Sequence, residues 1–199
     1  MSSAHPNAAP SPGPSAEHEG GKFLLWALDE RLPGAREHAD ATASYAFATA
    51  AELGIERDGC LLVREAARLH EVGKLYVPEP LLRRPRAQLT PQQLQRIESH
   101  AAAGARLARG AGVPEAACEW ILGAGERFDS GAGLALPARI IAAACTYDTL
   151  LRRRSQAGRA AQRWALIGVI EEAGRRLDPM AVDGLARVVE RAAGRIAGS

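Results

Sequence analysis

"LHEVGKLYVPEPLLRRPRAQLTPQQLQRIESHAAAGARL", residues 69–107, carries most of the information about the fold. A histidine and a glutamate stand side by side and are followed by Gly73 and Lys74. After a loop with three prolines, TPQQ (residues 90–93) has the Thr, Pro and Gln of a capping box. The segment therefore predicts a helix that ends near the His-Glu pair, a loop, and a second helix that runs to about Arg109.

The segments on either side are also predicted to be helical, because apolar or Ala-rich runs are bounded by Gly or Pro. Their ranges are 35–53, 58–72, 114–122, 137–151 and 159–173, and DPMAV (residues 178–182) starts a last helix. No segment has the alternation of a strand. We therefore expect an all-α protein, a compact bundle of about seven helices with no internal repeat.

Residues 1–21 are rich in Pro, Ser, Ala and Gly, and we expect them to form a disordered tail. Residues 22–199 are expected to form one helical domain. The net charge is only +2, which favours neither nucleic acid nor an anionic membrane as a partner. No apolar run approaches the ~18 residues of a membrane span. A signal peptide is not recognisable either, so a cytoplasmic location is expected.

Three cysteines, Cys60, Cys118 and Cys145, form no CxxC pair. Each lies in an apolar or Ala-rich run. Buried free thiols in a reducing compartment are therefore expected.

Three histidines outside the tail, His38, His70 and His100, stand on three different predicted helices. Glu71 adjoins His70, and adjacent helical residues point about 100° apart, so this pair can converge on one ion only at a helix end. Side chains from separate helices commonly build metal sites in bundles, and such a metal could polarise a phosphoryl oxygen. Lys74, one of two lysines beside 23 arginines, could then meet a phosphate. The spacing alone also fits core histidines and a solvated helix-end lysine.

The order of these motifs resembles the HD-GYP subgroup of the HD-domain phosphohydrolases, which hydrolyse the bacterial messenger cyclic di-GMP. The family pattern HDxGK, a xVPxxILxKP loop, LTxEE and a xxHxxxGAxxL helix is matched in order within residues 69–107. Three downstream segments are similar to further family motifs: GERFDSGAG (125–133), LPARIIAAACTYDTLL (136–151) and AGRRLDPMAV (173–182). The resemblance covers about residues 35–195. It implies an HD-GYP-like helical fold and metal-dependent phosphodiester chemistry in bacterial signal transduction.

The resemblance also implies site residues. It assigns metal ligands to His38, His70, Glu71 and His100, with Glu71 in place of aspartate, and it makes Glu71 and Lys74 the catalytic candidates. Cys145 falls at the position of a further, distal aspartate ligand. The candidates for contacting the ligand are Lys74, Arg127, Asp129 and Arg154.

Other positions depart from the family pattern. The paired histidines of the family fall on Ala124 and Gly125, and its Gly-Tyr-Pro loop falls on residues 132–134. Of the two metal positions that the family implies, the first retains His38, His70 and Glu71, with Cys145 in the last place. The second retains only Glu71 and His100, too few donors for tight binding.

The cofactor is therefore expected to be none or one divalent metal, Zn, Fe or Mn, at a degenerate site. A Cys145 thiolate would favour zinc over manganese or magnesium. Alternatively, Cys145 is a small buried residue and Glu71 pairs with a nearby arginine. Arg127 and Asp129 would then pair with each other, and Tyr147 and Asp148 would pack and hydrogen-bond against the last helices.

These departures favour a degenerate and catalytically inactive signalling domain. Such a domain would act as a protein-interaction or cyclic-nucleotide-binding regulatory module, with a signalling protein and cyclic di-GMP or another nucleotide as the expected partners. The alternative is a metal-dependent phosphohydrolase of the cyclic di-GMP phosphodiesterase type with an altered or single-metal site.

Overall fold

The computed structural model describes residues 19–130, 133–154 and 158–196. Within these ranges the chain is helical without a strand, apart from an isolated bridge between Ala173 and Leu177. In chain order the elements are α1 (Glu19–Arg31), α2 (Ala35–Glu52), α3 (Arg57–Leu69), η1 (Val72–Tyr76), α4 (Glu79–Leu82), η2 (Arg86–Gln88), α5 (Pro91–Glu98), α6 (His100–Gly110), α7 (Glu115–Gly123), η3 (Phe128–Ser130), α8 (Leu136–Arg152), α9 (Arg159–Glu171) and α10 (Pro179–Ile196). The prediction of an all-α protein is confirmed. Most of the predicted tail, residues 1–18, lies outside the described residues.

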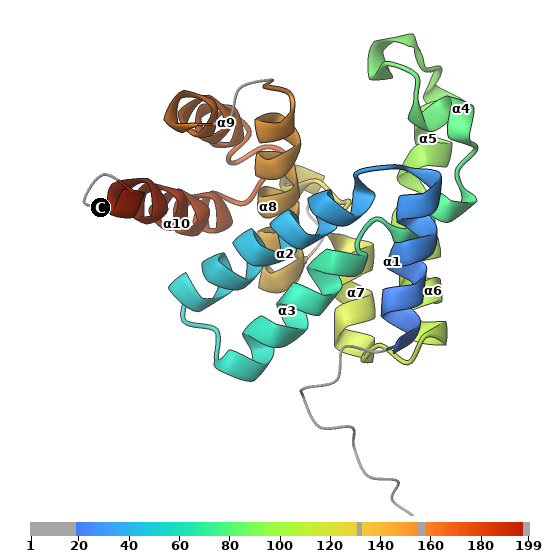
Figure 1. The fold of residues 1–199 in the computed structure, drawn as a ribbon, viewed down its shortest axis with the longest axis horizontal. Coiled ribbons are helices and arrows are strands. Elements are labelled where there is room, and N and C mark those ends of the chain that lie inside the picture. The colour runs from blue at the N-terminus through green and yellow to red at the C-terminus, as the bar shows by residue number, and fades with distance from the viewer. Residues whose placement is uncertain (1–18, 131–132, 155–157, 197–199) are drawn as a thin grey trace, which may run out of the picture.

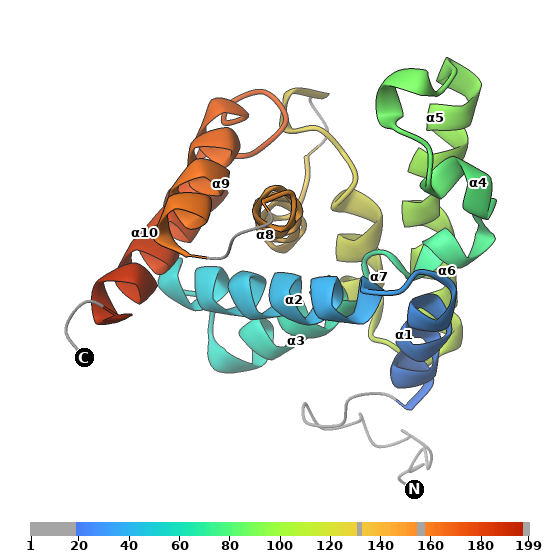
Figure 2. The same ribbon diagram turned by 45° about the horizontal axis from the view of Figure 1, so that its top comes forward.

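Helix α8 occupies the middle of the bundle. Figure 2 shows it end-on, with α2 crossing beside it, α9 and α10 on one flank and α7 on the other. It packs against all four of these helices. Figure 1 shows α4 and α5 on the opposite side of the molecule from α9 and α10. Three large side chains of α8, Ile140, Ile141 and Tyr147, are fully buried, so this helix supplies much of the core.

Small residues line the face of α2 that packs on the core. Ala39, Ala43, Ala46 and Ala50 recur at intervals of three or four residues, and each is at most 3% exposed. Side chains this short let α2 and its neighbours approach closely. His38 directly precedes this stripe, and the packing of α2 on α8 brings it towards the site described below.

Helix α1 begins at Glu19, inside the segment of residues 1–21 that the sequence predicted to be a disordered tail. Its first turn contains two glycines that pack closely on other elements. A Cβ on Gly20 would lie 2.8 Å from the Cβ of Ala111, and one on Gly21 would lie 3.3 Å from Cδ1 of Leu69. A tail-like composition therefore concealed a helical turn whose glycines allow close approach.

The helix predicted to run from the capping box to Arg109 divides at Ser99 into α5 and α6. Ser99 Oγ donates a 2.8 Å hydrogen bond to the carbonyl of Arg96, a side-chain bond that competes with helical pairing. The capping box itself is confirmed. The Gln93 amide donates to Thr90 Oγ1 at 3.3 Å, and the Thr90 amide donates to Gln93 Oε1 at 3.0 Å.

The proline loop between α3 and α5 differs from its prediction, because it contains two short helical turns, α4 and η2. None of the helices within the described ranges combines the length and apolar character that a membrane span requires.

Candidate metal centre

Four side chains from three parts of the chain converge beside the central helix. His38 comes from α2, His70 and Glu71 from the end of α3, and Cys145 from α8. One nitrogen, oxygen or sulfur atom of each lies within 4.8 Å of the others. A set of two imidazoles, a carboxylate and a thiol suits a tetrahedral site for an ion such as Zn²⁺.

A helix end makes this convergence possible. Helix α3 ends at Leu69, three residues before the predicted end, and His70 and Glu71 form the turn into η1. Glu71 has φ −103° and ψ −1°, so its backbone has left the regular helix. The expectation that this adjacent pair can converge only at a helix end agrees with this geometry.

Gly73 fixes the position of that turn. A Cβ built on Gly73 would lie 1.8 Å from the carbonyl oxygen of His100 and 2.5 Å from the amide nitrogen of Gly104. Only a residue without a side chain therefore lets η1 pack this closely on α6. From the other side, the Arg31 guanidinium of α1 donates to the carbonyls of Leu75 (2.5 Å) and Val77 (2.7 Å).

The imidazole of His70 presents an unused nitrogen to the site. His70 is 6% exposed, and its Nδ1 lies 2.7 Å from the carbonyl oxygen of Ala67, to which it donates. Its Nε2 is buried and has no hydrogen-bond partner within the described part of the chain. Burial lowers the pKa of His70, which keeps the ring neutral and leaves a lone pair on Nε2. A buried nitrogen of this kind is what a metal ion would satisfy.

The imidazole of His38 is held by Asp148. Its Nδ1 lies 2.6 Å from Oδ2 of Asp148, and the same oxygen accepts a 2.5 Å hydrogen bond from Nε of Arg152. The other ring nitrogen, Nε2, lies 3.7 Å from Sγ of Cys145 and 3.9 Å from Oε2 of Glu71. A carboxylate behind a histidine is the usual support of a metal-binding imidazole.

The same neighbours set the protonation of His38 in the absence of an ion. Burial by itself lowers the pKa of His38, but the hydrogen bonds with Asp148 and Cys145 and the charge of Glu71 outweigh it. Together they raise the pKa to about 9. The site therefore holds a positive charge on His38 where an ion would otherwise supply it.

Sequence reasoning missed the role of Asp148. It was expected to bond to the last helices, but it faces α2 instead. A signal was present, because Asp148 follows Cys145 by three residues and therefore shares its face of α8.

Glu71 pairs with Lys74. The alternative interpretation of the sequence had proposed an arginine as its partner, and that prediction was wrong. Lys74 Nζ donates to Glu71 Oε1 across one turn. Burial raises the pKa of Glu71, but the positive charges of Lys74 and His38 outweigh burial and lower the pKa well below its usual value. Glu71 is therefore an ionised carboxylate, and both residues that sequence reasoning named as catalytic lie at this site.

His100 is not a member of the four-residue group found in the described ranges. It begins α6, where its Nδ1 lies 2.7 Å from the carbonyl oxygen of Ile97. Burial lowers the pKa of His100. The charge of Glu71 acts to raise this pKa, and the charge of Lys74 acts to lower it. Ala124 and Gly125, at the end of α7, offer no side-chain donor. Of the five predicted metal ligands, four come together.

The remaining predicted ligand-binding residues have other contacts. Arg127 and Asp129 form a double hydrogen bond at 2.8 and 2.7 Å on the surface, as the simpler interpretation expected. The Arg154 guanidinium lies 4.3 Å from the centre of the Trp164 ring. Cys60 and Cys118 are buried free thiols as predicted, whereas Cys145 is only partly buried.

Comparisons with known proteins place this geometry in a family. RpfG, a cyclic di-GMP phosphodiesterase response regulator of Xanthomonas campestris pv. campestris, is 28% identical over 174 residues, which cover 82% of this chain and 46% of that protein. A probable cyclic di-GMP phosphodiesterase of Vibrio cholerae is 29% identical over 135 residues, which cover 60% of this chain and 30% of that protein. The chain thus spans less than half the length of these curated relatives.

Solved structures share the fold at low sequence identity. The HD domain of the L. monocytogenes phosphodiesterase PgpH, in complex with cyclic di-AMP, superposes with a TM-score of 0.66 at 18% identity, over 87% of this chain and 96% of that one. Bd1817, an HDG"Y"P protein from Bdellovibrio bacteriovorus, superposes with a TM-score of 0.65 at 16% identity, over 87% of this chain and 62% of that one. The sequence profile of the HD domain matches residues 24–181. Because that match spans most of the chain, the chain belongs to the HD-domain family.

Proposed function

We propose that this chain is a regulatory HD domain that binds one metal ion and does not hydrolyse cyclic di-GMP. The observation that carries the proposal is the four-donor group of His38, His70, Glu71 and Cys145, the one such group among the residues that the structure describes. A second ion would need further donors, and the positions where HD-GYP proteins carry paired histidines hold Ala124 and Gly125. Two-metal hydrolysis requires both ions to activate the attacking oxygen and clamp the phosphate.

The residues present would hold one ion. The neutral His70 and the Asp148-supported His38 each direct Nε2 inward, and Glu71 and Cys145 complete the set. A thiolate donor favours zinc over manganese or magnesium. When bound, the ion supplies Lewis acidity and a fixed positive charge. Lys74 places a second positive charge on the same side of Glu71.

A regulatory role follows from binding without turnover. The named relatives are cyclic di-GMP phosphodiesterases, one of them a response regulator. A signalling protein is the expected partner, with a nucleotide as the signal. In this role the chain would bind a nucleotide, as the phosphodiesterases do, but would not hydrolyse it.

Metal-dependent phosphodiesterase activity is the second candidate. The ion pair of Glu71 and Lys74 favours it, because it holds an ionised carboxylate and a phosphate-binding charge together at the site. One well-placed ion can in principle activate water without a second.

Metal analysis combined with an activity assay separates the two candidates. The purified protein is expected to hold one equivalent of metal by mass spectrometry and to release no product from cyclic di-GMP with added Mn²⁺ or Fe²⁺. Substitution His70→Ala should abolish metal binding, and His100→Ala, the matched control outside the group, should leave one equivalent. Two equivalents per chain, with turnover that His70→Ala abolishes, would contradict the proposal.

A further inference from the structure

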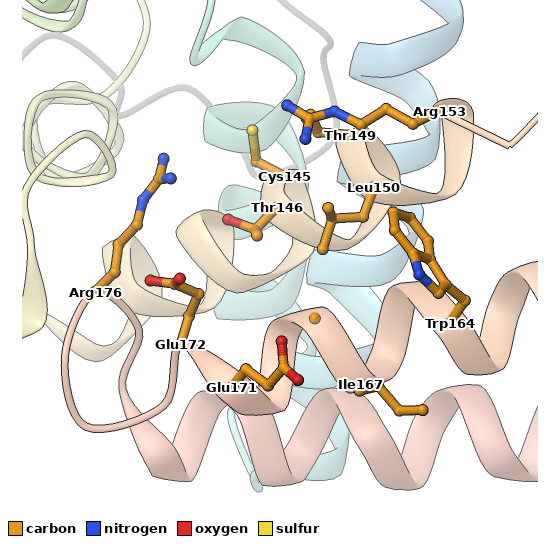
Figure 3. A pocket seen from close by; sticks show the side chains of 11 residues that line it. Cys145, Thr146, Thr149, Leu150, Arg153, Trp164, Ile167, Glu171, Glu172 and Arg176 are labelled. Atoms are coloured by element: carbon orange, nitrogen blue, oxygen red, sulfur yellow. The ribbon is translucent and has the colours of Figure 1, made fainter. Parts of the chain in front are cut away.

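A pocket lies against the metal centre, between α8 and α9. Its volume is about 430 Å³. Its lining includes Cys145, Leu150, Arg153, Trp164, Glu171 and Arg176 (Figure 3). Cys145 belongs both to this lining and to the four-donor group, so the pocket opens directly beside the candidate metal position.

Two arginines bring positive charge to the pocket from different elements. Arg153 comes from the end of α8 and Arg176 from the loop before α10. Figure 3 shows both side chains extending towards the side of the pocket where the Cys145 thiol lies. Among the described residues, neither guanidinium has an ion pair or hydrogen bond with a carboxylate, although ten arginine–carboxylate ion pairs occur elsewhere in the described part of the chain. Uncommitted guanidinium groups beside a metal position suit a phosphate.

The side of the pocket away from Cys145 carries a carboxylate instead of guanidinium groups. In Figure 3 the Glu171 carboxylate lies away from Cys145. The Thr146 hydroxyl and the Glu172 carboxylate lie on one side of the space between them, and Leu150 and Trp164 lie on the other side. A carboxylate only accepts hydrogen bonds when ionised, so it selects a ligand edge that carries N–H donors. The pocket thus has a cationic end and an accepting end, with an apolar wall formed by Leu150 and Trp164.

The volume limits the size of the ligand. Drug-sized ligands occupy pockets of about 300–1,000 Å³, and the volume here lies near the lower limit. A nucleoside monophosphate has ~24 non-hydrogen atoms, and a cyclic dinucleotide has about twice as many. The smaller molecule matches this pocket.

We infer that the pocket binds a nucleoside monophosphate, with the phosphate between Arg153 and Arg176 and the base edge towards Glu171. Guanine fits this end best, because its ring N–H and amino group present two adjacent donors to a carboxylate. The inference rests on the proposed function, since it names the ligand of the regulatory module. It departs from the cyclic dinucleotides named for the relatives.

Calorimetry on the zinc-loaded full chain tests this inference, with GMP, AMP, inorganic phosphate and cyclic di-GMP as separate probes. GMP is expected to bind more tightly than the other three. Substitution Arg176→Ala should weaken GMP binding at least about tenfold, because a charge-assisted contact is lost. Substitution Glu171→Gln should weaken GMP more than phosphate. The matched control Arg163→Ala removes an arginine of α9 that does not line the pocket and should have no effect.

The outcomes separate this inference from the proposed function. No heat with GMP, equal binding after Arg176→Ala, or tighter binding of cyclic di-GMP overturns the inference, even when the same sample holds one metal equivalent and is inactive. Two metal equivalents with turnover overturn the proposed function, and the effect of Arg176→Ala on GMP binding still decides the inference.

Discussion

At the scale of single residues, Asp148 determines how His38 faces the metal centre. Its carboxylate holds Nδ1 of His38 and is itself held by Arg152. Asp148→Asn should therefore lower metal affinity by about 10–100-fold, the usual effect of losing such a support. Competition with a chromophoric chelator measures this change. The control Asp183→Asn alters an exposed carboxylate of α10, and equal affinity loss in both variants would refute the role of Asp148.

Cys145 is predicted to decide which metal the candidate centre prefers. In protein loaded with Co²⁺, a thiolate ligand gives a sulfur-to-metal charge-transfer band, and this band is expected in the wild type. Cys145→Ser should remove it, whereas Cys118→Ser, which alters a thiol buried elsewhere in the core, should retain it. A band that survives Cys145→Ser would show that the thiol is not a ligand.

The sequence predicted some residues of this site but not all of them. His38, His70 and Glu71 were predicted because motif order assigned them, and Cys145 was left open between ligand and core residue. The contact of His38 with Asp148 joins residues 110 positions apart, and no local pattern encodes it. The partner predicted for Glu71, an arginine, was also wrong, because Lys74 lies one turn away and pairs with the Glu71 carboxylate.

At the scale of elements, the packing of η1 on α6 holds the His-Glu turn in place. Gly73→Ala would put a Cβ 1.8 Å from the carbonyl oxygen of His100. The backbones of η1 and α6 would therefore have to move apart. The free energy of unfolding should fall by about 1–3 kcal/mol or more. Urea unfolding measures it. Gly110→Ala, with no atom within 4 Å of its Cβ, is the control and should change stability by less than about 1 kcal/mol.

The helices themselves were largely predictable, because apolar spacing, Gly and Pro mark their ends locally. The errors fall where tertiary contacts decide. Ser99 interrupts a periodic run, and Gly20 and Gly21 lie in a helical turn that packs closely on Ala111 and Leu69. Composition alone could not distinguish such glycines from those of a tail.

At the scale of the whole molecule, the candidate metal centre lies where three elements of the core meet. His38 lies on α2, His70 follows α3, and Cys145 lies on α8. The Ala-rich faces let these helices approach, but alanines bury little apolar surface each, so the core gains less stability than one of larger side chains. An ion shared by the three elements would tie them together.

Metal binding should therefore stabilise the entire fold. An ion at 100 times its Kd adds about 2.7 kcal/mol, and for a chain of this size each kcal/mol raises Tm by about 2–4 °C. Zinc added to chelator-stripped protein should then raise Tm by roughly 5–10 °C in a calorimetric scan. In His70→Ala the starting Tm can differ, but the increment on adding zinc should vanish, because the buried Nε2 is lost. An equal increment in this variant would mean that zinc acts elsewhere on the chain, and the link between the centre and the stability of the bundle would fail.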